Sequence, residues 1–356
     1  MKIRLLLFDD IPANREQVRR ALSHALGAQG EVQEFVSGTG GLTDGTYEVR
    51  LKADLLTAPN ALADLIVADR DLSGYKDHFP GLSEDTVRRV AEVIGVPECG
   101  YARGERDDVS DYIKRGEERE ACIRLPLQPS LDQFAQRVVA IANGFVTIAD
   151  ALKALEEKRL PPAKLLATIL GKPEYADKIA LYASGDQNRL ATVLRAKSNE
   201  EEQRRRLACL LGYWLWDSVL RFPGVTVGTI PASSYLNIKQ DVFENDNNIK
   251  AIFNEARYQG PFAAAKVDMW WRGMLDDIVA ESGCRDGREL ATKRLGSEIP
   301  ASQCCEEPGI SAGYYCMLRG KPVSLKCSKG GLPWFPRGAD LARVSNSALD
   351  EFGPWL

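Results

Sequence analysis

Short apolar runs alternate with amphipathic stretches over the first 127 residues of the chain. Residues 3–8 and 64–68 are almost entirely apolar, a pattern typical of strands buried on both faces of a parallel sheet. Residues 31–36 predict a further strand. Pro12 can begin a helix, where its missing N–H costs nothing, and apolar residues recur at helical spacing over residues 18–26. Alternating strands and helices predict an α/β domain with an open sheet, whose ligand site lies at the carboxyl ends of the strands.

A long amphipathic helix is predicted next. Ser130 and Gln133 have the spacing of a capping box, which marks the start of a helix. Apolar residues then recur at alternating spacings of three and four, as in a heptad seam. The seam residues are Leu131, Phe134, Val138, Ile141, Phe145, Ile148, Leu152 and Leu155. The seam fits either the buried face of one long helix or a linker helix that pairs with a second copy of the chain, and residues 161–162, both proline, end it.

The rest of the chain has weaker patterns. Residues 163–222 look helical throughout, residues 267–279 predict another helix, and residues 314–327 predict a hairpin. These changes of pattern divide the chain into four parts. They are an α/β domain (1–129), a heptad linker helix (130–158), a helical region (159–225) and a smaller C-terminal α+β module of unknown role (226–356).

The composition is that of an ordinary globular protein. Of the 356 residues, 44% are hydrophobic and 27% are charged, and the formal net charge of −4 gives no general attraction to nucleic acid or anionic lipid. The arginines at 204–206 follow glutamates at i,i+4 spacing, so they predict a salt-bridged helix surface rather than a DNA-binding patch. Apolar runs fall far short of the ~18 residues of a membrane span, and the first is too short for a signal sequence. Eight cysteines without a regular framework predict a reduced, cytoplasmic protein.

Acidic residues follow two of the predicted strands. Asp9 and Asp10 come directly after the first strand, Asp69 ends another, and Asp71 lies two residues further on. If these strands are neighbours in a parallel sheet, their carboxylates share one cleft, repel one another and need a cation. Oxygen ligands of this kind suit Mg²⁺, which usually takes one or two carboxylates together with phosphate oxygens. The pattern therefore predicts phosphoryl chemistry in which one carboxylate is the nucleophile.

Two of these stretches resemble the receiver domain of two-component response regulators. Residues 5–15 (LLLFDDIPANR) match the family's opening strand, acid pair and helix start, and residues 64–74 (DLIVADRDLSG) match the strand with the phosphoacceptor and the turn after it. Residues 123–127 (IRLPL) match, less specifically, the last strand with its cis-proline turn. The resemblance spans about residues 2–129 and implies a CheY-like, doubly wound, parallel five-stranded sheet.

The resemblance implies a role for each acid. Asp69 would accept a phosphoryl group from a histidine kinase or phosphotransfer protein. Asp10 and Asp69 would bind Mg²⁺ directly, Asp9 would bind it through water, and the backbone carbonyl of Asp71 would complete the site. The chain would then be a signalling protein of a phosphorelay rather than an enzyme, with at most self-phosphotransfer and autodephosphorylation.

Two positions depart from the family's pattern. The Ser or Thr at the end of the fourth strand falls at Ala102, and the Lys before the last proline falls at Leu125. Arg103 and Arg124 lie beside these positions and could contact the phosphoryl oxygens instead, since guanidinium is a good phosphate ligand. Phosphorylation is therefore expected, and unless one of these arginines substitutes, the conformational switching typical of the family would be altered or absent.

The C-terminal region has no recognisable helix-turn-helix and no basic stripe, so we expect output through protein interaction rather than DNA binding. The unusual architecture suggests a bacterial stress or anti-phage setting. Two alternatives stay open. The domain is a pseudo-receiver that serves only for dimerisation or interaction, or it is a Mg²⁺-dependent phosphoryl-transfer enzyme or nuclease that uses the same acids.

Four cysteines, Cys304, Cys305, Cys316 and Cys327, lie within 24 residues of one another. Zinc sites usually take their thiolates from Cys-x₂₋₄-Cys pairs, and no such pair occurs here. Buried free thiols are the expected state of these residues.

Overall fold

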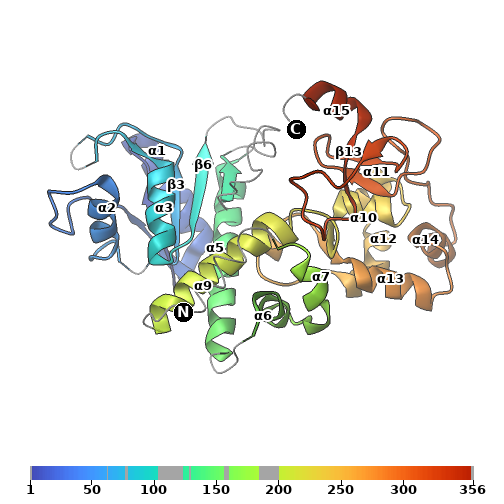
Figure 1. Ribbon diagram of the computed structural model, residues 1–356, viewed down its shortest axis with the longest axis horizontal. Helices are drawn as coiled ribbons and strands as arrows, with labels where there is room; N and C mark the ends of the chain where they lie inside the picture. Colours follow the sequence, from blue (N-terminus) through green and yellow to red (C-terminus); the bar gives the residue numbers. More distant parts are fainter. Residues whose placement is uncertain are drawn as a thin grey trace. The chain divides into compact units, whose positions relative to one another are not determined.

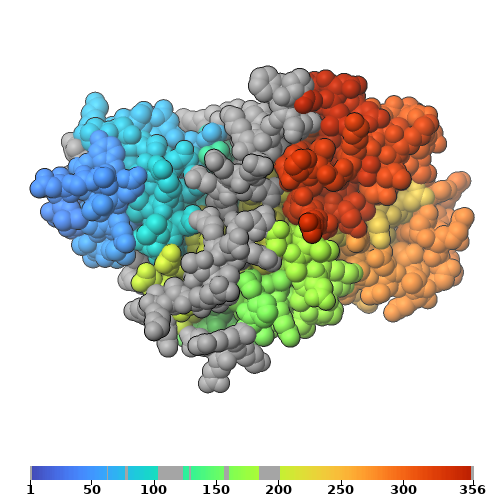
Figure 2. All heavy atoms as spheres, in the orientation of Figure 1, coloured from blue at the N-terminus to red at the C-terminus, as the bar shows by residue number. Residues whose placement is uncertain are grey.

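The computed structural model describes residues 2–61, 63–76, 79–102, 123–127, 130–155, 160–183 and 200–353; they are coloured along the sequence in Figure 1 and Figure 2. They form two compact units, each built from separate stretches of sequence. The first unit falls within residues 1–107, 121–162 and 186–214, and the second within residues 163–185 and 215–356. In the part of the chain that is described, every helix is too short or too polar to cross a bilayer.

A five-stranded parallel sheet forms the centre of the first unit (Figure 1). Its strands follow the order β2-β1-β3-β6-β7, and every neighbouring pair is parallel. The strands are β1 (Ile3–Phe8), β2 (Gly30–Glu34), β3 (Leu65–Asp69), β6 (Glu98–Ala102) and β7 (Ile123–Pro126). Nearly every side chain of β1 and β3 is buried, as their apolar runs predict. The predicted α/β fold with a parallel sheet is confirmed.

Helices cover both faces of this sheet. α1 and α5 pack against each other on one face, α2 and α3 pack together on the other, and α9 contacts both α5 and α3. The helices are α1 (Pro12–Leu26), α2 (Tyr47–Leu55), α3 (Glu84–Ile94), α5 (Leu131–Ala154) and α9 (Glu200–Trp214). A 3₁₀ turn, η1 (Gly27–Gln29), follows α1. A short antiparallel pair, β4 (Asp71–Leu72) and β5 (Leu82–Ser83), precedes α3. This arrangement is consistent with a doubly wound fold.

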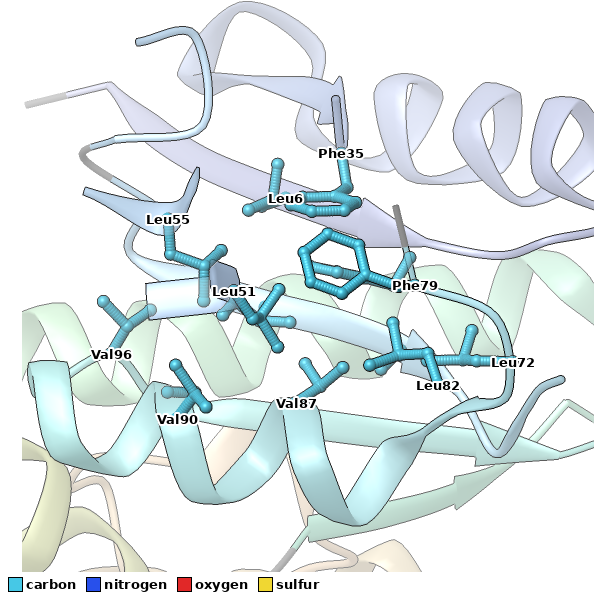
Figure 3. Close-up of a cluster of buried hydrophobic side chains, with 14 of the residues drawn as sticks. Leu6, Phe35, Leu51, Leu55, Leu72, Phe79, Leu82, Val87, Val90 and Val96 are labelled. Carbon is cyan, nitrogen blue, oxygen red and sulfur yellow. The ribbon is translucent and has the colours of Figure 1, made fainter. Parts of the chain in front are cut away.

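The core under α2 and α3 joins residues far apart in the sequence. Leu6 from β1, Leu51 from α2 and Val87 from α3 are fully or almost fully buried and point toward one another (Figure 3). The rings of Phe35 and Phe79 lie at the same cluster, with their centroids 6.0 Å apart. Burying one such side chain stabilises the fold by about 1.5–3 kcal/mol, so the cluster fixes how α2 and α3 lie on the sheet.

Local signals place the ends of the helices. Pro12 occupies the first turn of α1, as predicted. Ser130 caps α5, where its side chain accepts a hydrogen bond from the backbone N–H of Gln133 at 3.2 Å. Six of the eight seam residues of α5 are buried, and Leu131 and Leu155 are partly exposed. The chain itself covers this seam, and pairing with a second copy through it stays a prediction.

The expectation of a cis-proline turn at Pro126 is wrong in one respect. The peptide bond between Leu125 and Pro126 is not cis. The reason is that Pro126 still belongs to β7, where it is paired with Ala102, and an extended strand is continued by the trans form.

The region predicted to be helical throughout is only partly so. Its described parts are α6 (Pro162–Ile169), η2 (Pro173–Tyr175), α7 (Ala176–Ala180), α9 and a π-helical turn η3 (Leu215–Val219). Residues 184–199 of this prediction lie outside the described residues.

The second unit mixes short helices with two small sheets. β8 (Thr226–Gly228) pairs antiparallel with β9 (Met269–Trp271), and a four-stranded sheet has the order β11-β10-β13-β12. The strands of the latter are β10 (Tyr314–Cys316), β11 (Lys321–Val323), β12 (Ser328–Lys329) and β13 (Ala342–Ser345). The helices are α10 (Thr229–Tyr235), α11 (Gln240–Asn245), α12 (Asn247–Ile252), η4 (Asn254–Ala256), η5 (Ala263–Ala265), α13 (Arg272–Glu281), α14 (Gly287–Leu295) and α15 (Asn346–Phe352).

Two predictions for this unit have different outcomes. The hairpin is confirmed, because β10 and β11 pair antiparallel. The helix over residues 267–279 is wrong at its start, since β9 precedes α13. Trp270 and Trp271 are buried in β9 and pair there with β8, so tertiary pairing overrides the helical spacing.

Candidate functional site

The acidic residues lie together at the carboxyl edge of the parallel sheet. Phe8 and Ala68 are paired across β1 and β3, so the next residues along, Asp9 and Asp69, lie side by side at the ends of their strands. The charges of Asp9 and Asp10 both raise the pKa of Asp69, which shows that the three carboxylates share one electrostatic environment. The structure therefore brings together the acids that the sequence places after two separate strands.

Asp9 is the most firmly held of the three. It is fully buried, and its Oδ1 accepts the backbone N–H of Ile11 at 2.9 Å, while its Oδ2 accepts the hydroxyl of Tyr101 at 2.7 Å. Arg15 donates to the backbone carbonyl of Asp9 at 2.8 Å. Burial raises the pKa of the Asp9 carboxyl, and the two hydrogen bonds to its oxygens oppose that rise.

Asp10 turns one oxygen to the loop after β3. Its Oδ2 accepts a short hydrogen bond from the backbone N–H of Gly74. A Cβ at residue 74 would collide with this carboxylate, so the close approach requires glycine there. The other oxygen, Oδ1, is buried and has no hydrogen-bond partner among the described residues. An unpaired, buried carboxylate oxygen is a suitable ligand for a cation.

Asp69 is partly exposed and carries the largest resolved pKa shift of the acids at this edge. Burial is the main cause, and the charges of Asp9 and Asp10 add to it, so that the pKa of Asp69 rises from its ordinary 3.8 to about 6. The backbone N–H of Asp71 donates to Asp69 Oδ1 at 3.2 Å and partly offsets the rise. A carboxylate in this setting gains stability from any cation that neutralises its neighbours.

The side chain of Asp71 faces its own turn. Its Oδ1 accepts both the hydroxyl and the backbone N–H of Ser73, and these bonds lower the pKa of this exposed carboxyl. Its backbone pairs with Ser83, which caps α3. The turn after Asp69 is therefore tied directly to the start of α3.

The predicted phosphoryl contacts differ in their placement. Asp69 pairs with Tyr101, and Tyr101 pairs with Leu125, so these three side chains project from the same face of the sheet. Arg124 lies one residue earlier, on the opposite face, and its Nε is 3.4 Å from Glu84 Oε1. Ala102 ends β6 and offers only a methyl group, and Arg103 lies outside the described residues.

The roles of two residues at this edge were not predicted from the sequence. Tyr101 holds Asp9 through its hydroxyl, and Gly74 holds Asp10 through its backbone. A tyrosine at the end of a predicted strand does not by itself indicate a contact with an aspartate, because only the register of β6 against β3 shows which face of the sheet the tyrosine projects from.

A second acidic feature lies on the other face of the same sheet. Glu98 is fully buried, and neither of its carboxylate oxygens has a hydrogen-bond partner among the described residues. Burial, followed by the charge of Glu84, raises its pKa well above the ordinary value, while Arg88 and Arg124 act in the opposite sense. Burial therefore disfavours the ionised form of Glu98 in the folded unit.

Ligands for a metal at the carboxyl edge would come from mixed sources. Within the described ranges, no three side chains of His, Cys, Asp or Glu are placed to hold a metal ion by themselves. Mg²⁺ usually takes only one or two protein carboxylates and keeps several waters. Asp10 and Asp69, a backbone carbonyl and water meet that requirement.

Comparison of the sequence with models of known protein families gives no match, and comparison with curated proteins gives none either.

Proposed function

We propose that the first unit is a receiver-like phosphoacceptor domain, in which Asp69 takes a phosphoryl group from a histidine kinase or phosphotransfer protein. The observation that supports this proposal best is the convergence of Asp9, Asp10 and Asp69 at the carboxyl edge of a parallel sheet of order β2-β1-β3-β6-β7. Ligand sites of open α/β sheets occur at this edge.

The residues present fit a bound Mg²⁺. Asp10 offers a buried oxygen that has no hydrogen-bond partner among the described residues. Burial and the charges of Asp9 and Asp10 raise the pKa of Asp69, and a cation would neutralise those charges. The backbone carbonyl of Asp71 is the third protein ligand in this proposal, and Asp9 acts through water because both of its oxygens already accept hydrogen bonds. When bound, the ion would supply charge neutralisation for the incoming phosphoryl group.

Asp69 supplies the nucleophile for the transfer. One Oδ of Asp69 attacks the phosphorus of a phosphohistidine, the P–N bond breaks, and the imidazole leaves with the electron pair of that bond and takes a proton from water. The product is an acyl phosphate on Asp69. With a pKa of about 6, Asp69 is ionised at neutral pH and above, which is the nucleophilic form.

The proposed readout differs from that of the family. Tyr101 and Leu125 share the face of Asp69, and neither is the small hydroxyl or the lysine that the family uses. Tyr101 instead donates to Asp9. The turn after Asp69 is tied to Ser83 at the start of α3, so this segment is the part of the unit that a phosphoryl group on Asp69 would disturb first. Output is proposed to pass to a protein partner.

The same observations favour one second candidate, a pseudo-receiver that serves as an interaction or dimerisation module without phosphorylation. Leu125 and Ala102 supply no charged or hydroxyl group to a phosphoryl oxygen, and Arg124 is paired with Glu84 on the opposite face.

A phosphorylation assay separates the two. The purified full chain is incubated with Mg²⁺ and a small phosphodonor such as acetyl phosphate, and intact mass and peptide mapping follow the gain of one phosphoryl group. We expect labelling of the wild type and of Asp71→Asn, whose backbone carbonyl is kept, and no labelling of Asp69→Asn. Equal labelling of Asp69→Asn would remove Asp69 as the acceptor. Absence of labelling together with absence of Mg²⁺ and beryllofluoride binding would favour the pseudo-receiver.

A further inference from the structure

Two cysteines of the second unit, Cys304 and Cys327, come from separate segments and contact the same residue, Ser324. The Cys304 Sγ accepts the backbone N–H of Ser324 at 3.4 Å, and the Ser324 Oγ accepts the backbone N–H of Cys327 at 3.2 Å. The Cys327 Sγ also lies 3.7 Å from Glu307 Oε2. The two cysteines are 4% and 7% exposed, so both lie just beneath the surface.

The sulfur of Cys304 sits among backbone donors. The N–H of Ser324 donates to it at 3.4 Å, and the backbone N–H groups of Glu306 and Glu307 also favour its ionised form. These hydrogen bonds lower the pKa of the Cys304 thiol despite its burial. The pKa of Cys327 is raised: its interaction with Ser324 lowers the pKa, but burial and the neighbouring Cys304 and Glu307 outweigh that effect. Of the two, Cys304 is therefore the thiol that ionises more readily.

The neighbouring cysteines differ from this pair. Cys305 is exposed, but burial of its sulfur and the charge of Cys304 raise its pKa to about 11. Cys316 is buried in β10, where its sulfur accepts the backbone N–H of Ser345 at 3.3 Å. Among the described residues, no hydrogen bond joins either of them to Ser324, which contacts both Cys304 and Cys327.

We propose that Cys304 and Cys327 are a redox-sensitive dithiol that a hydroperoxide converts to a reversible disulfide. The thiolate of Cys304 attacks one peroxide oxygen, the O–O bond breaks, and the leaving oxygen takes up a proton as water or alcohol. Cys304 is then a sulfenic acid. Cys327 passes its proton to Glu307 and attacks that sulfur; the S–O bond breaks, and hydroxide leaves as water with that proton. The two thiols supply the two electrons that reduce the peroxide.

A metal site is the alternative use of the same thiols. The described residues contain no third Cys, His, Asp or Glu placed to complete a metal site with this pair. Structural zinc requires four ligands, so the geometry favours the disulfide.

The experiment starts from the fully reduced full chain, which is treated with an equivalent of hydrogen peroxide under anaerobic conditions. Remaining thiols are alkylated, and disulfides are mapped by mass spectrometry. We expect one disulfide that joins residues 304 and 327 and is reversed by dithiothreitol. In Cys327→Ser, the sulfenic acid of Cys304 should persist and react with dimedone. In Cys304→Ser, residue 327 should remain a thiol. Cys316→Ser, the matched control, should behave as the wild type.

Three results would overturn the proposal, and the first two need no variant. One is a disulfide that joins Cys304 to any residue other than Cys327. Another is oxidation of Cys305 ahead of Cys304. The third is one zinc ion per purified chain that both Cys304→Ser and Cys327→Ser abolish, with no disulfide in the wild type after the metal is removed.

Discussion

Replacement of Asp69 by asparagine should stabilise the first unit at neutral pH in the absence of divalent cations. Burial and the charges of Asp9 and Asp10 raise the pKa of Asp69 from 3.8 to about 6, so ionised Asp69 is less favourable in the folded than in the unfolded chain. Asparagine removes the charge and keeps an oxygen that can accept the N–H of Asp71.

The magnitude follows from the shift. About two pKa units at 1.36 kcal/mol each set an upper limit of about 3 kcal/mol. Because Asp69 is partly exposed, solvent screening reduces the expected gain to about 1–2 kcal/mol. The sign depends on pH. Below 3.8 the carboxyl is protonated in both states and costs nothing, and stability falls as the pH rises through about 6. The advantage of Asp69→Asn should therefore appear between pH 4 and pH 7 and stay constant above.

Hydrogen exchange of peptides from β1 and β3 measures the stability difference between Asp69→Asn and the wild type within the first unit. The measurement does not assume that both units unfold together. Asp71→Asn is the matched control, because the carboxyl of Asp71 is exposed and its pKa is lowered rather than raised. Mg²⁺ at a hundred times its dissociation constant should raise the free energy of unfolding of the wild type by about 2.7 kcal/mol, and that of Asp69→Asn by much less. Equal or weaker protection of Asp69→Asn at pH 7.5 without Mg²⁺ would refute the electrostatic reasoning.

Three further changes test other contacts. Tyr101→Phe removes the hydroxyl that donates to Asp9, so the pKa of Asp9 should rise further. The free energy of unfolding should fall by about 1–2 kcal/mol at pH 7 but not at pH 3. Carboxyl NMR titration and unfolding at both pH values measure these effects, and an unchanged pKa of Asp9 would contradict the prediction. Glu98→Gln should become progressively more stable than the wild type as the pH rises above 4.5, because burial penalises the ionised carboxyl in the folded unit. Thermal unfolding across pH measures this difference in stability, and parallel curves for the two proteins would count against the reasoning. Gly212→Ala should destabilise the packing of α9 on α5 by about 1–3 kcal/mol, because the added methyl group would collide with the ring of Phe145. Thermal unfolding measures the loss, and an unchanged melting temperature would show that the two helices adjust freely.

The sheet and the acidic edge could be predicted because each follows from short-range patterns. An apolar run such as Ile3–Phe8 predicts a strand buried on both faces, and helices between such strands predict parallel pairing. Parallel strands end at one edge, so Asp9 and Asp69 could be expected to meet before their positions were known. The cap at Ser130 is equally local, since donor and acceptor lie three residues apart.

Register could not be predicted in the same way. Tyr101 lies beside Asp69, and Arg124 lies on the opposite face, because of pairings between strands that are far apart in the sequence. A shift of one residue reverses the face, so a list of residues near the end of a strand does not show which of them meet. The strand Met269–Trp271 is a similar case, because pairing with β8 rather than its own spacing decides its conformation.

The return of α9 to the first unit constrains how that unit can be made. Residues 163–183 belong to the second unit, whereas Glu200–Trp214 packs on α3 and α5 of the first. A fragment that stops at residue 129 or 158 therefore leaves bare the apolar surface that α9 covers. During synthesis, the earlier unit reaches its final packing only after residue 214 has left the ribosome, when part of its neighbour has already emerged. Neither unit can be released from the other by a single cut of the chain.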